Sequence, residues 1–106
     1  MKTTSIHREP EILHWALQRN IIGPTATGTR QAQCRKTMEE CRELGHGIGT
    51  DNRDEVRDAI GDIIVTLAIQ ASMWGMSLHE CIDAAWDQIK DRKGQMVNGT
   101  FVKETL

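Results

Sequence analysis

Cysteine is scarce in this chain, which has three among its 106 residues. Cys34, Cys41 and Cys81 are not at a spacing typical of a metal site, so they predict no zinc centre. An odd number of cysteines also favours reduced thiols in a cytoplasm over a disulfide-bonded secreted domain. Cys34 and Cys41 are seven residues apart, so with Met38 and Leu44 they should form one apolar stripe on a helix.

Excess positive charge and long apolar runs are also missing. The formal net charge is −2, which argues against a protein that binds nucleic acid through a basic face. The longest apolar run, residues 63–74, contains Thr66, Gln70 and Ser72, whereas a membrane span needs roughly 18 apolar residues. The first ten residues lack the apolar centre of a secretory signal. We therefore expect a cytoplasmic protein with no nucleic-acid and no membrane partner.

Apolar residues recur every three to four positions along most of the chain, which predicts helices. We expect four, over residues 10–20, 30–45, 52–74 and 77–93. The Gly/Pro/Thr-rich segment between the first two should be a loop. A chain of this length holds one core, so residues 1–106 should form a single domain in which 1–9 are flexible.

Local signals predict where these helices begin and end. The glycines of GHGIGT should break the second helix, Asp51 should be the N-cap of the third, and Gly94 should end the fourth. Ser77 and Glu80 form a capping box at the start of the fourth helix. The Asn-Gly pair at position 98 lies between β-forming residues and predicts a short hairpin. The expected fold is an all-α, four-helix domain with a short non-helical C-terminal tail.

Two of the predicted helices carry a stripe of carboxylates. Each stripe lies on one helix face because its members are close in helical spacing: Glu39, Glu40 and Glu43 on the second helix, and Glu55, Asp58 and Asp62 on the third. Antiparallel helices joined by a short loop are neighbours, so the stripes can face each other across a divalent ion. Oxygen ligands without paired Cys or His favour Mg²⁺ or Mn²⁺. The alternative is a solvated face, where charged residues are ordinary.

Asp62 is the carboxylate that a solvated face explains least well. Apolar residues follow it for three turns, and a carboxylate buried among them needs a partner. We therefore expect Asp62 to be paired or metal-bound. Gly61 beside it weakens the helix, which suggests that another group approaches this backbone closely. Glu55, near a helix N-terminus, should instead interact with the helix dipole and contribute little to a site.

Three segments of the chain resemble a known family: KTMEECREL at 36–44, DAIGDIIVTL at 58–67 and IKDRKGQMVNGTFVKE at 89–104. They look like the MazG-like all-α nucleoside triphosphate pyrophosphohydrolases, in particular the short, single-domain bacteriophage form. The likeness extends from Trp15 onward. It implies a helical fold that assembles as homodimers or homotetramers. It also implies Mg²⁺-dependent hydrolysis of nucleoside triphosphates, expected to be deoxy, to the monophosphate and pyrophosphate, which adjusts nucleotide pools during phage replication.

The resemblance assigns ligand roles to the acidic stripes. The family's first motif, ExxE, corresponds to Glu40 and Glu43, and its second, ExxD, ends at Asp62. The chain departs from the second motif because Ala59 stands where the glutamate is expected, and Asp58, one turn from Asp62, can replace it. The implied ligands of Mg²⁺, for which Mn²⁺ should substitute, are Glu40, Glu43, Asp58 and Asp62.

The implied catalytic residues are Glu39, Glu40, Glu43 and Asp62. The ion would neutralise phosphate charge and activate a water molecule. Glu39 or Glu43 would orient or deprotonate that water. Which of the two does so, and which phosphorus is attacked, stay open.

Basic and aromatic residues are candidates to bind the substrate: Lys36, Trp15, Lys90, Arg92, Lys93 and Asn98. The three basic residues near position 90 follow the fourth helix, where cations also complement the helix dipole. Lys36 is either a salt-bridge partner of Glu40 or a phosphate contact, and Asn98 is either a turn residue or a phosphate or sugar contact. Trp15 is either a core residue or the surface on which the base stacks.

Two other functions compete with hydrolysis. A non-catalytic helical module that dimerises through the apolar third helix would explain the departure at Ala59. A small DNA-binding repressor is a weak alternative because no helix shows a basic face. A chain this short has few places to bury residues 60–74, so a second copy should cover part of them. Trp74 and Trp86 should lie in the core or in a subunit interface.

Overall fold

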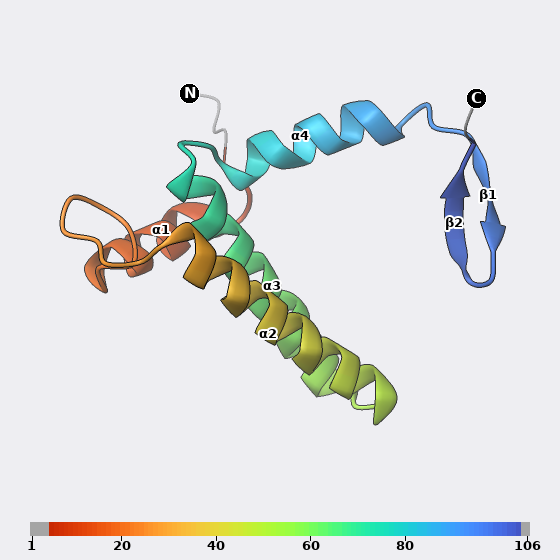
Figure 1. The fold of residues 1–106 in the computed structure, drawn as a ribbon, viewed down its shortest axis with the longest axis horizontal. Coiled ribbons are helices and arrows are strands. Elements are labelled where there is room, and N and C mark those ends of the chain that lie inside the picture. The colour runs from red at the N-terminus through yellow and green to blue at the C-terminus, as the bar shows by residue number, and fades with distance from the viewer. Residues whose placement is uncertain (1–4, 105–106) are drawn as a thin grey trace.

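A computed structural model describes residues 5–104 of the chain (Figure 1). It contains four helices and one two-stranded sheet: α1 (Glu9–Gln18), α2 (Arg30–Gly49), α3 (Arg53–Met73), α4 (Leu78–Ile89), β1 (Gly94–Val97) and β2 (Thr100–Lys103). The predicted all-α fold with a short non-helical tail is confirmed. The two longest helices, α2 and α3, run antiparallel as a helical hairpin, and α1 packs against α3. Figure 1 shows α4 leaving this hairpin sideways and carrying the strands away from it.

Small and polar residues join α2 to α3. Gln33 Nε2 donates a hydrogen bond to the carbonyl oxygen of Thr66 at 3.3 Å, and the Thr37 hydroxyl donates to the Thr66 hydroxyl at 2.9 Å. Gly47 is buried further along the same face, and a Cβ there would lie 3.1 Å from Val56 Cγ2. The face of α2 that packs on α3 therefore holds few large side chains.

That packed face corrects the predicted apolar stripe of α2. Its least exposed residues are at positions 33, 37, 40, 44 and 47. Of the expected stripe, Leu44 lies on this face, whereas Cys34, Met38 and Cys41 are one residue out of phase with it. Those three side chains are exposed. Because the packed face is polar, the apolar pattern of the sequence identified a different face of the helix.

The predicted end of the second helix is wrong for a related reason. The helix α2 continues through GHGIG to Gly49, although glycine in a helix interior costs about 1 kcal/mol relative to alanine. Gly47 lets Val56 approach closely, and the Thr50 hydroxyl donates to the His46 carbonyl at 2.8 Å. Tertiary packing and this capping bond extend the helix by one turn beyond the predicted end.

Two helix ends differ from the prediction by a few residues. The N-cap of α3 is Asn52, whose side chain accepts from the backbone N–H of Glu55 at 3.1 Å, and Asp51 has a left-handed φ of 53° in the preceding turn. The helix α4 ends at Ile89, so Gly94 begins β1 instead of ending the helix. A Cβ at Gly94 would collide with the ring of Phe101, which explains the glycine at this first strand position.

Two local predictions are confirmed. The Ser77 side chain accepts from the backbone N–H of Glu80 at 3.1 Å, which is the first of the two bonds of a capping box and makes Ser77 the N-cap of α4. The strands pair antiparallel with Val97 opposite Thr100. The two turn residues, Asn98 and Gly99, both have positive φ, at 50° and 87°, which is the conformation of a two-residue hairpin turn.

The buried core of one chain consists mostly of small residues: Ala16, Ala59, Ala68, Ile69, Ala71 and Leu78. Of the apolar segment 60–74, for which we expected few places of burial in a chain this short, the single chain buries Thr66, Ala68, Ile69 and Ala71. Ile64 and Leu67 of the same segment stay exposed. Trp74 and Trp86 are also exposed, so neither belongs to the core, and a place in a subunit interface stays a prediction.

Glu9 connects the start of α1 to the start of α4. Its carboxylate is buried and accepts hydrogen bonds from the backbone N–H of Leu78 at 2.6 Å and of Ile6 at 3.1 Å. An anion is favourable at the N-terminus of α4 because the helix dipole is positive there. Residues 1–9 were expected to be flexible. Residues 1–4 lie outside the described part of the chain, and within the rest of this segment Glu9 is held by its two hydrogen bonds.

Within residues 5–104, no single helix has both the length and the apolar character needed to cross a membrane. Taken together α3 and α4 reach that length and composition, but the chain bends by 99° between them.

Candidate metal and nucleotide site

Carboxylates from α2 and α3 line one cleft of about 250 Å³. We call it the acidic cleft, and its lining residues are Glu39, Glu40, Glu43, Glu55, Asp58, Ala59 and Asp62. The antiparallel hairpin places the two stripes opposite each other, so the structure brings together the predicted acidic residues. Every candidate donor in the lining is a carboxylate oxygen, a set that suits Mg²⁺ or Mn²⁺.

The carboxylates of α2 differ in burial. The Glu40 side chain is only 13% exposed because position 40 belongs to the face packed on α3, whereas Glu39 and Glu43 are exposed. Lys36 Nζ lies 3.5 Å from both Glu39 Oε2 and Glu40 Oε1. The charge of the Glu39 carboxylate, with a smaller contribution from Glu40, raises the pKa of Lys36. In this chain Lys36 therefore makes the salt bridge that was one of its two predicted roles.

The carboxylates of α3 also have different surroundings. The Glu55 side chain is 25% exposed, and its Oε1 lies 2.6 Å from Nδ1 of His46. The Asp58 side chain is 72% exposed and its Oδ1 lies 3.8 Å from Nε of Arg57. The hydrogen bond to Glu55 is the main reason why the pKa of His46 is raised. Glu55 is thus the more enclosed and more firmly held of the two acids.

The expected burial of Asp62 is wrong for this chain. Asp62 is exposed, and it makes no ion pair within residues 5–104. Apart from its own helix, no atom of residues 5–104 lies within 4 Å of a Cβ built on Gly61, so the expected close approach is not found at that position. Several apolar side chains after Asp62, such as Ile64 and Leu67, are exposed. The apolar run therefore does not bury the carboxylate that precedes it. A metal-bound role for Asp62 stays a prediction.

The carboxylates line the cleft without converging on one point. Among the described residues, no three His, Cys, Asp or Glu side chains are grouped so that they could hold one ion. Ala59, at the position of the missing family glutamate, lines the cleft and is 2% exposed. The donor chemistry of the cleft fits a divalent cation, and position 59 adds no donor to it.

A second pocket, of about 480 Å³, adjoins the acidic cleft. It is lined by Arg8, Glu11, Ile12, Trp15, Asp62 and Val65, so Asp62 borders both. Trp15 is 43% exposed, which excludes the predicted core role in this chain. The guanidinium of Arg19 lies 4.5 Å from the centre of its ring. We call this the Trp15 pocket.

The structure does not bring the predicted C-terminal substrate residues to the acidic cleft. Lys90, Arg92 and Lys93 follow α4, and Asn98 lies at the tip of the hairpin, which Figure 1 shows at the far end of α4 from α2 and α3. Lys90 Nζ lies 3.3 Å from Asp87 Oδ1, in an exposed pair. Within one chain these residues are therefore separated from the carboxylates.

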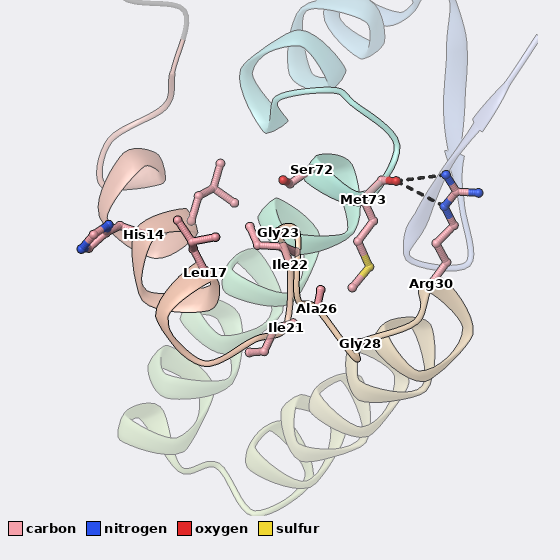
Figure 2. Close-up of a pocket in the computed structure, with 11 residues that line it drawn as sticks. His14, Leu17, Ile21, Ile22, Gly23, Ala26, Gly28, Arg30, Ser72 and Met73 are labelled. Atoms are coloured by element: carbon pink, nitrogen blue, oxygen red, sulfur yellow. Dashed lines mark hydrogen bonds between the residues drawn. The ribbon is translucent and has the colours of Figure 1, made fainter.

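A larger pocket, of about 570 Å³, lies between α1, the loop after it and the end of α3 (Figure 2). Most of its lining is apolar and none of it is a carboxylate. Arg30 donates two hydrogen bonds to the carbonyl oxygen of Met73, at 3.1 and 3.3 Å, and its guanidinium stacks 3.8 Å from the ring centre of Trp74. The Arg30 bonds join the start of α2 to the end of α3. The described lining of the pocket has one imidazole, His14, but lacks the carboxylates that Mg²⁺ would need.

Comparison with known proteins adds a family to this geometry. The MazG nucleotide pyrophosphohydrolase domain matches residues 29–97, which is more than half of the chain. The chain belongs to the MazG nucleotide pyrophosphohydrolase family. The MazG match spans α2, α3, α4 and β1, and so includes every residue of the acidic cleft, whereas α1 with Trp15 lies outside it.

A phage protein is also similar to this MazG chain. It is an uncharacterised 18.2 kDa protein from the rep-hol intergenic region of Haemophilus phage HP1, 38% identical over 60 residues. The aligned part is 57% of this chain and 35% of the phage protein, so the chain spans about a third of the length of that relative. No solved structure gives a significant match. The predicted resemblance to the MazG-like family and its phage members is confirmed.

One cleft residue was underestimated from the sequence. Glu55 was placed in the acidic stripe of the third helix but assigned to the helix dipole, whereas in the structure it lines the acidic cleft. The signal was present in the spacing, because Glu55, Ala59 and Asp62 fall at intervals of four and three residues on one helix face.

Proposed function

We propose that this MazG domain hydrolyses nucleoside triphosphates, with a preference for deoxynucleotides, to the monophosphate and pyrophosphate. The observation that carries the proposal is the acidic cleft, in which carboxylates from two antiparallel helices face each other inside the segment matched by the family. Such a surface repels a triphosphate unless a cation neutralises it. We therefore propose Mg²⁺ as the cofactor, with Mn²⁺ as a substitute.

The cleft residues would divide two tasks. Glu40, Glu43 and Asp62 would hold the ion, and Asp58 is the candidate for the fourth position that the resemblance offers. When bound, Mg²⁺ neutralises phosphate charge and activates a water molecule for attack. Glu39 or Glu43, both exposed at the cleft, would orient that water and accept its proton. Lys36 would exchange its carboxylate contacts for a phosphate oxygen.

The Trp15 pocket suits the nucleoside part of the substrate. It adjoins the acidic cleft at Asp62, and Ile12 and Val65 give it apolar walls beside the indole ring. Nucleobases commonly stack on aromatic side chains. A base on Trp15 would leave the phosphates over the carboxylates of α2 and α3, so the two neighbouring pockets can accommodate the two parts of one nucleotide.

We propose a homo-oligomer, either dimer or tetramer, because it would explain the exposed apolar side chains of the single chain and the position of its basic residues. The hairpin of α2 and α3 exposes large apolar side chains: Met38, Ile48, Ile60, Ile64 and Leu67. Contiguous exposed apolar surface marks an interaction site. The basic residues after α4 lie far from their own cleft, and we propose that in the assembly they bind the phosphates of a nucleotide in a partner's cleft.

An assay of pyrophosphate release tests the proposed activity directly. The eight common nucleoside triphosphates are incubated with the full chain and Mg²⁺, and then with Mn²⁺ or a chelator. We expect metal-dependent pyrophosphate and monophosphate from at least one deoxynucleotide, in keeping with a role in nucleotide pools of phage replication. No turnover with either metal would favour the non-catalytic dimerisation module instead.

A further inference from the structure

Position 59 leaves the acidic cleft one carboxylate short of the family pattern. Ala59 lines the cleft and is 2% exposed, so the chain has a methyl group where the resemblance expects an acid. A metal site that keeps its other carboxylates needs that charge from elsewhere, because affinity for hard cations depends on the number and charge of the oxygen ligands. Two acids on α3 line the cleft close to Ala59: Glu55 and Asp58.

We infer that Glu55, held in place by His46, supplies to the metal site the carboxylate that is missing at Ala59. The inference rests on the proposed function, since it concerns the ion that this function requires. It departs from the choice of Asp58 suggested by the sequence, and it gives a role in the site to a residue outside the family motif.

The surroundings of the two acids distinguish them. Asp58 is 72% exposed and directed to Arg57, at 3.8 Å, so it is hydrated and already close to a cation. Glu55 is 25% exposed and lies on the same helix face as Ala59 and Asp62. Interactions of an ion with a partly enclosed carboxylate are screened less by water. Glu55 is therefore the better placed of the two.

His46 acts on Glu55 from the opposite helix. Its Nδ1 lies 2.6 Å from Glu55 Oε1, and the backbone N–H of Glu55 is fixed separately by Asn52 at 3.1 Å. Carboxylates that bind metals are commonly oriented by hydrogen bonds from neighbouring groups. Loss of such a bond weakens metal affinity. Oε1 of Glu55 is thus occupied by His46, whereas Oε2 has no hydrogen bond or ion pair within residues 5–104, and the side chain lines the acidic cleft. His46 is a positioning residue in this arrangement.

A titration of the metal-free full chain with Mn²⁺ tests the inference without any substrate. The signal of free Mn²⁺ in electron paramagnetic resonance measures how much of the ion is bound. We expect Glu55→Gln to weaken Mn²⁺ binding about ten-fold or more. The matched control is Asp54→Asn, which removes one negative charge from the same helix outside the cleft and should change the affinity less than about two-fold, as a screened charge does.

The role of His46 has its own pair of variants. His46→Ala should weaken Mn²⁺ binding several-fold, and His46→Asn should restore most of it, because the Asn amide nitrogen can donate from a place close to that of Nδ1. A purely structural role of His46 would instead lower the melting temperature of both variants and leave Mn²⁺ affinity unchanged.

Each outcome separates this inference from the proposed function. If the unaltered chain binds Mn²⁺ and Glu55→Gln binds it equally well, or if Asp58→Asn shows the loss instead, the role of Glu55 is refuted while the function can stand. If the unaltered chain binds no Mn²⁺, both fail. If Glu55→Gln loses Mn²⁺ affinity but the chain hydrolyses no triphosphate, the inference about the ion stands and the proposed reaction is refuted.

Discussion

The two halves of this molecule are built in different ways. The hairpin of α2 and α3 is held by buried contacts such as the Gln33–Thr66 and Thr37–Thr66 hydrogen bonds, and it contains the whole acidic cleft. The C-terminal arm, which consists of α4, β1 and β2, extends away from it (Figure 1), and every strand residue is exposed. The hairpin contributes every residue of the acidic cleft, whereas the basic residues of the arm lie away from that cleft, and one of them, Lys90, pairs with Asp87 of the arm itself. Under the proposed function, this difference is explained if the arm contributes to the site of another copy.

The largest effect should come from the hairpin. Asp62→Asn removes a ligand charge at nearly constant volume, and we expect turnover to fall on the order of a thousand-fold, since the loss of metal-based stabilisation amounts to several kcal/mol. Because Asp62 is exposed, the free energy of unfolding should change by less than about 0.5 kcal/mol. Steady-state pyrophosphate release and urea unfolding measure the two. A fully active variant would contradict the placement of the ion.

Charge in the apolar face should separate the copies. Ile64→Glu places a carboxylate among the exposed apolar residues of α3, and an unpaired charge buried in an interface is costly. We expect sedimentation at micromolar concentration to show monomers for this variant and a larger species for the unaltered chain. Gln31→Glu, an equal change in charge at an exposed position of α2, should leave the assembly intact. Monomers of the unaltered chain would refute the oligomer.

Removing the basic residues of the arm should weaken substrate binding and leave metal binding unchanged. Lys90→Ala/Arg92→Ala/Lys93→Ala should raise KM about ten-fold or more, because each hydrogen bond to a charged group contributes roughly 1.5–3 kcal/mol. Mn²⁺ affinity should not change, since these residues do not line the acidic cleft. The single control Arg35→Ala, at an exposed cation of α2, should have little effect on either quantity. A parallel loss of Mn²⁺ affinity would mean that the two halves are not independent.

Two glycines in α2 test how closely the hairpin is packed. Nothing lies within 4 Å of a Cβ built on Gly45, so Gly45→Ala should stabilise the chain by up to about 1 kcal/mol through helix propensity. At Gly47 the new methyl would lie 3.1 Å from the backbone nitrogen of Val56, and Gly47→Ala should stabilise less or destabilise. Urea unfolding gives the comparison. Equal gains at both positions would show that α2 and α3 are not in close contact there.

The smallest effect concerns the pH dependence of the His46–Glu55 pair. The pKa of His46 is raised by its hydrogen bond to Glu55, so its contribution to stability is fully present below the unfolded pKa of about 6.5 and is lost as the pH rises through the folded value. A titration of metal-free protein by NMR should place His46 above its ordinary value, and Glu55→Gln should return it there. No change in that variant would contradict the contact.

Local chemistry made part of this fold predictable. The Asn98-Gly99 turn and the Ser77 cap depend on neighbouring residues only, and both are as expected. The end of α2 was not predictable from GHGIG, because the role of Gly47 is to admit Val56 from another helix. The packed face of α2 was placed one residue away from its true position, since polar contacts to Thr66 decide it and apolar residues face outward.

The candidate site was predictable in the same uneven way. Spacing on two helices was enough to gather the carboxylates, because antiparallel packing then places them opposite each other. The burial of Asp62 was inferred wrongly, since an apolar run in a small chain can face outward as well as inward. The spacing placed Glu55 on the cleft side of its helix, but it did not predict the contact with His46, because that contact joins two helices and depends on how they pack.

The buried carboxylate at Glu9 gives the first helix influence over a region that it never touches directly. That side chain accepts a hydrogen bond from the backbone of Leu78, where α4 begins, so together with the contacts between α3 and α4 it helps to fix the direction of the arm that carries the basic residues. The helix α1 lies before the segment shared with the family, so this contact with α4 is not part of the shared segment. A chain shortened to the shared segment would keep its carboxylates and lose the alignment of its arm.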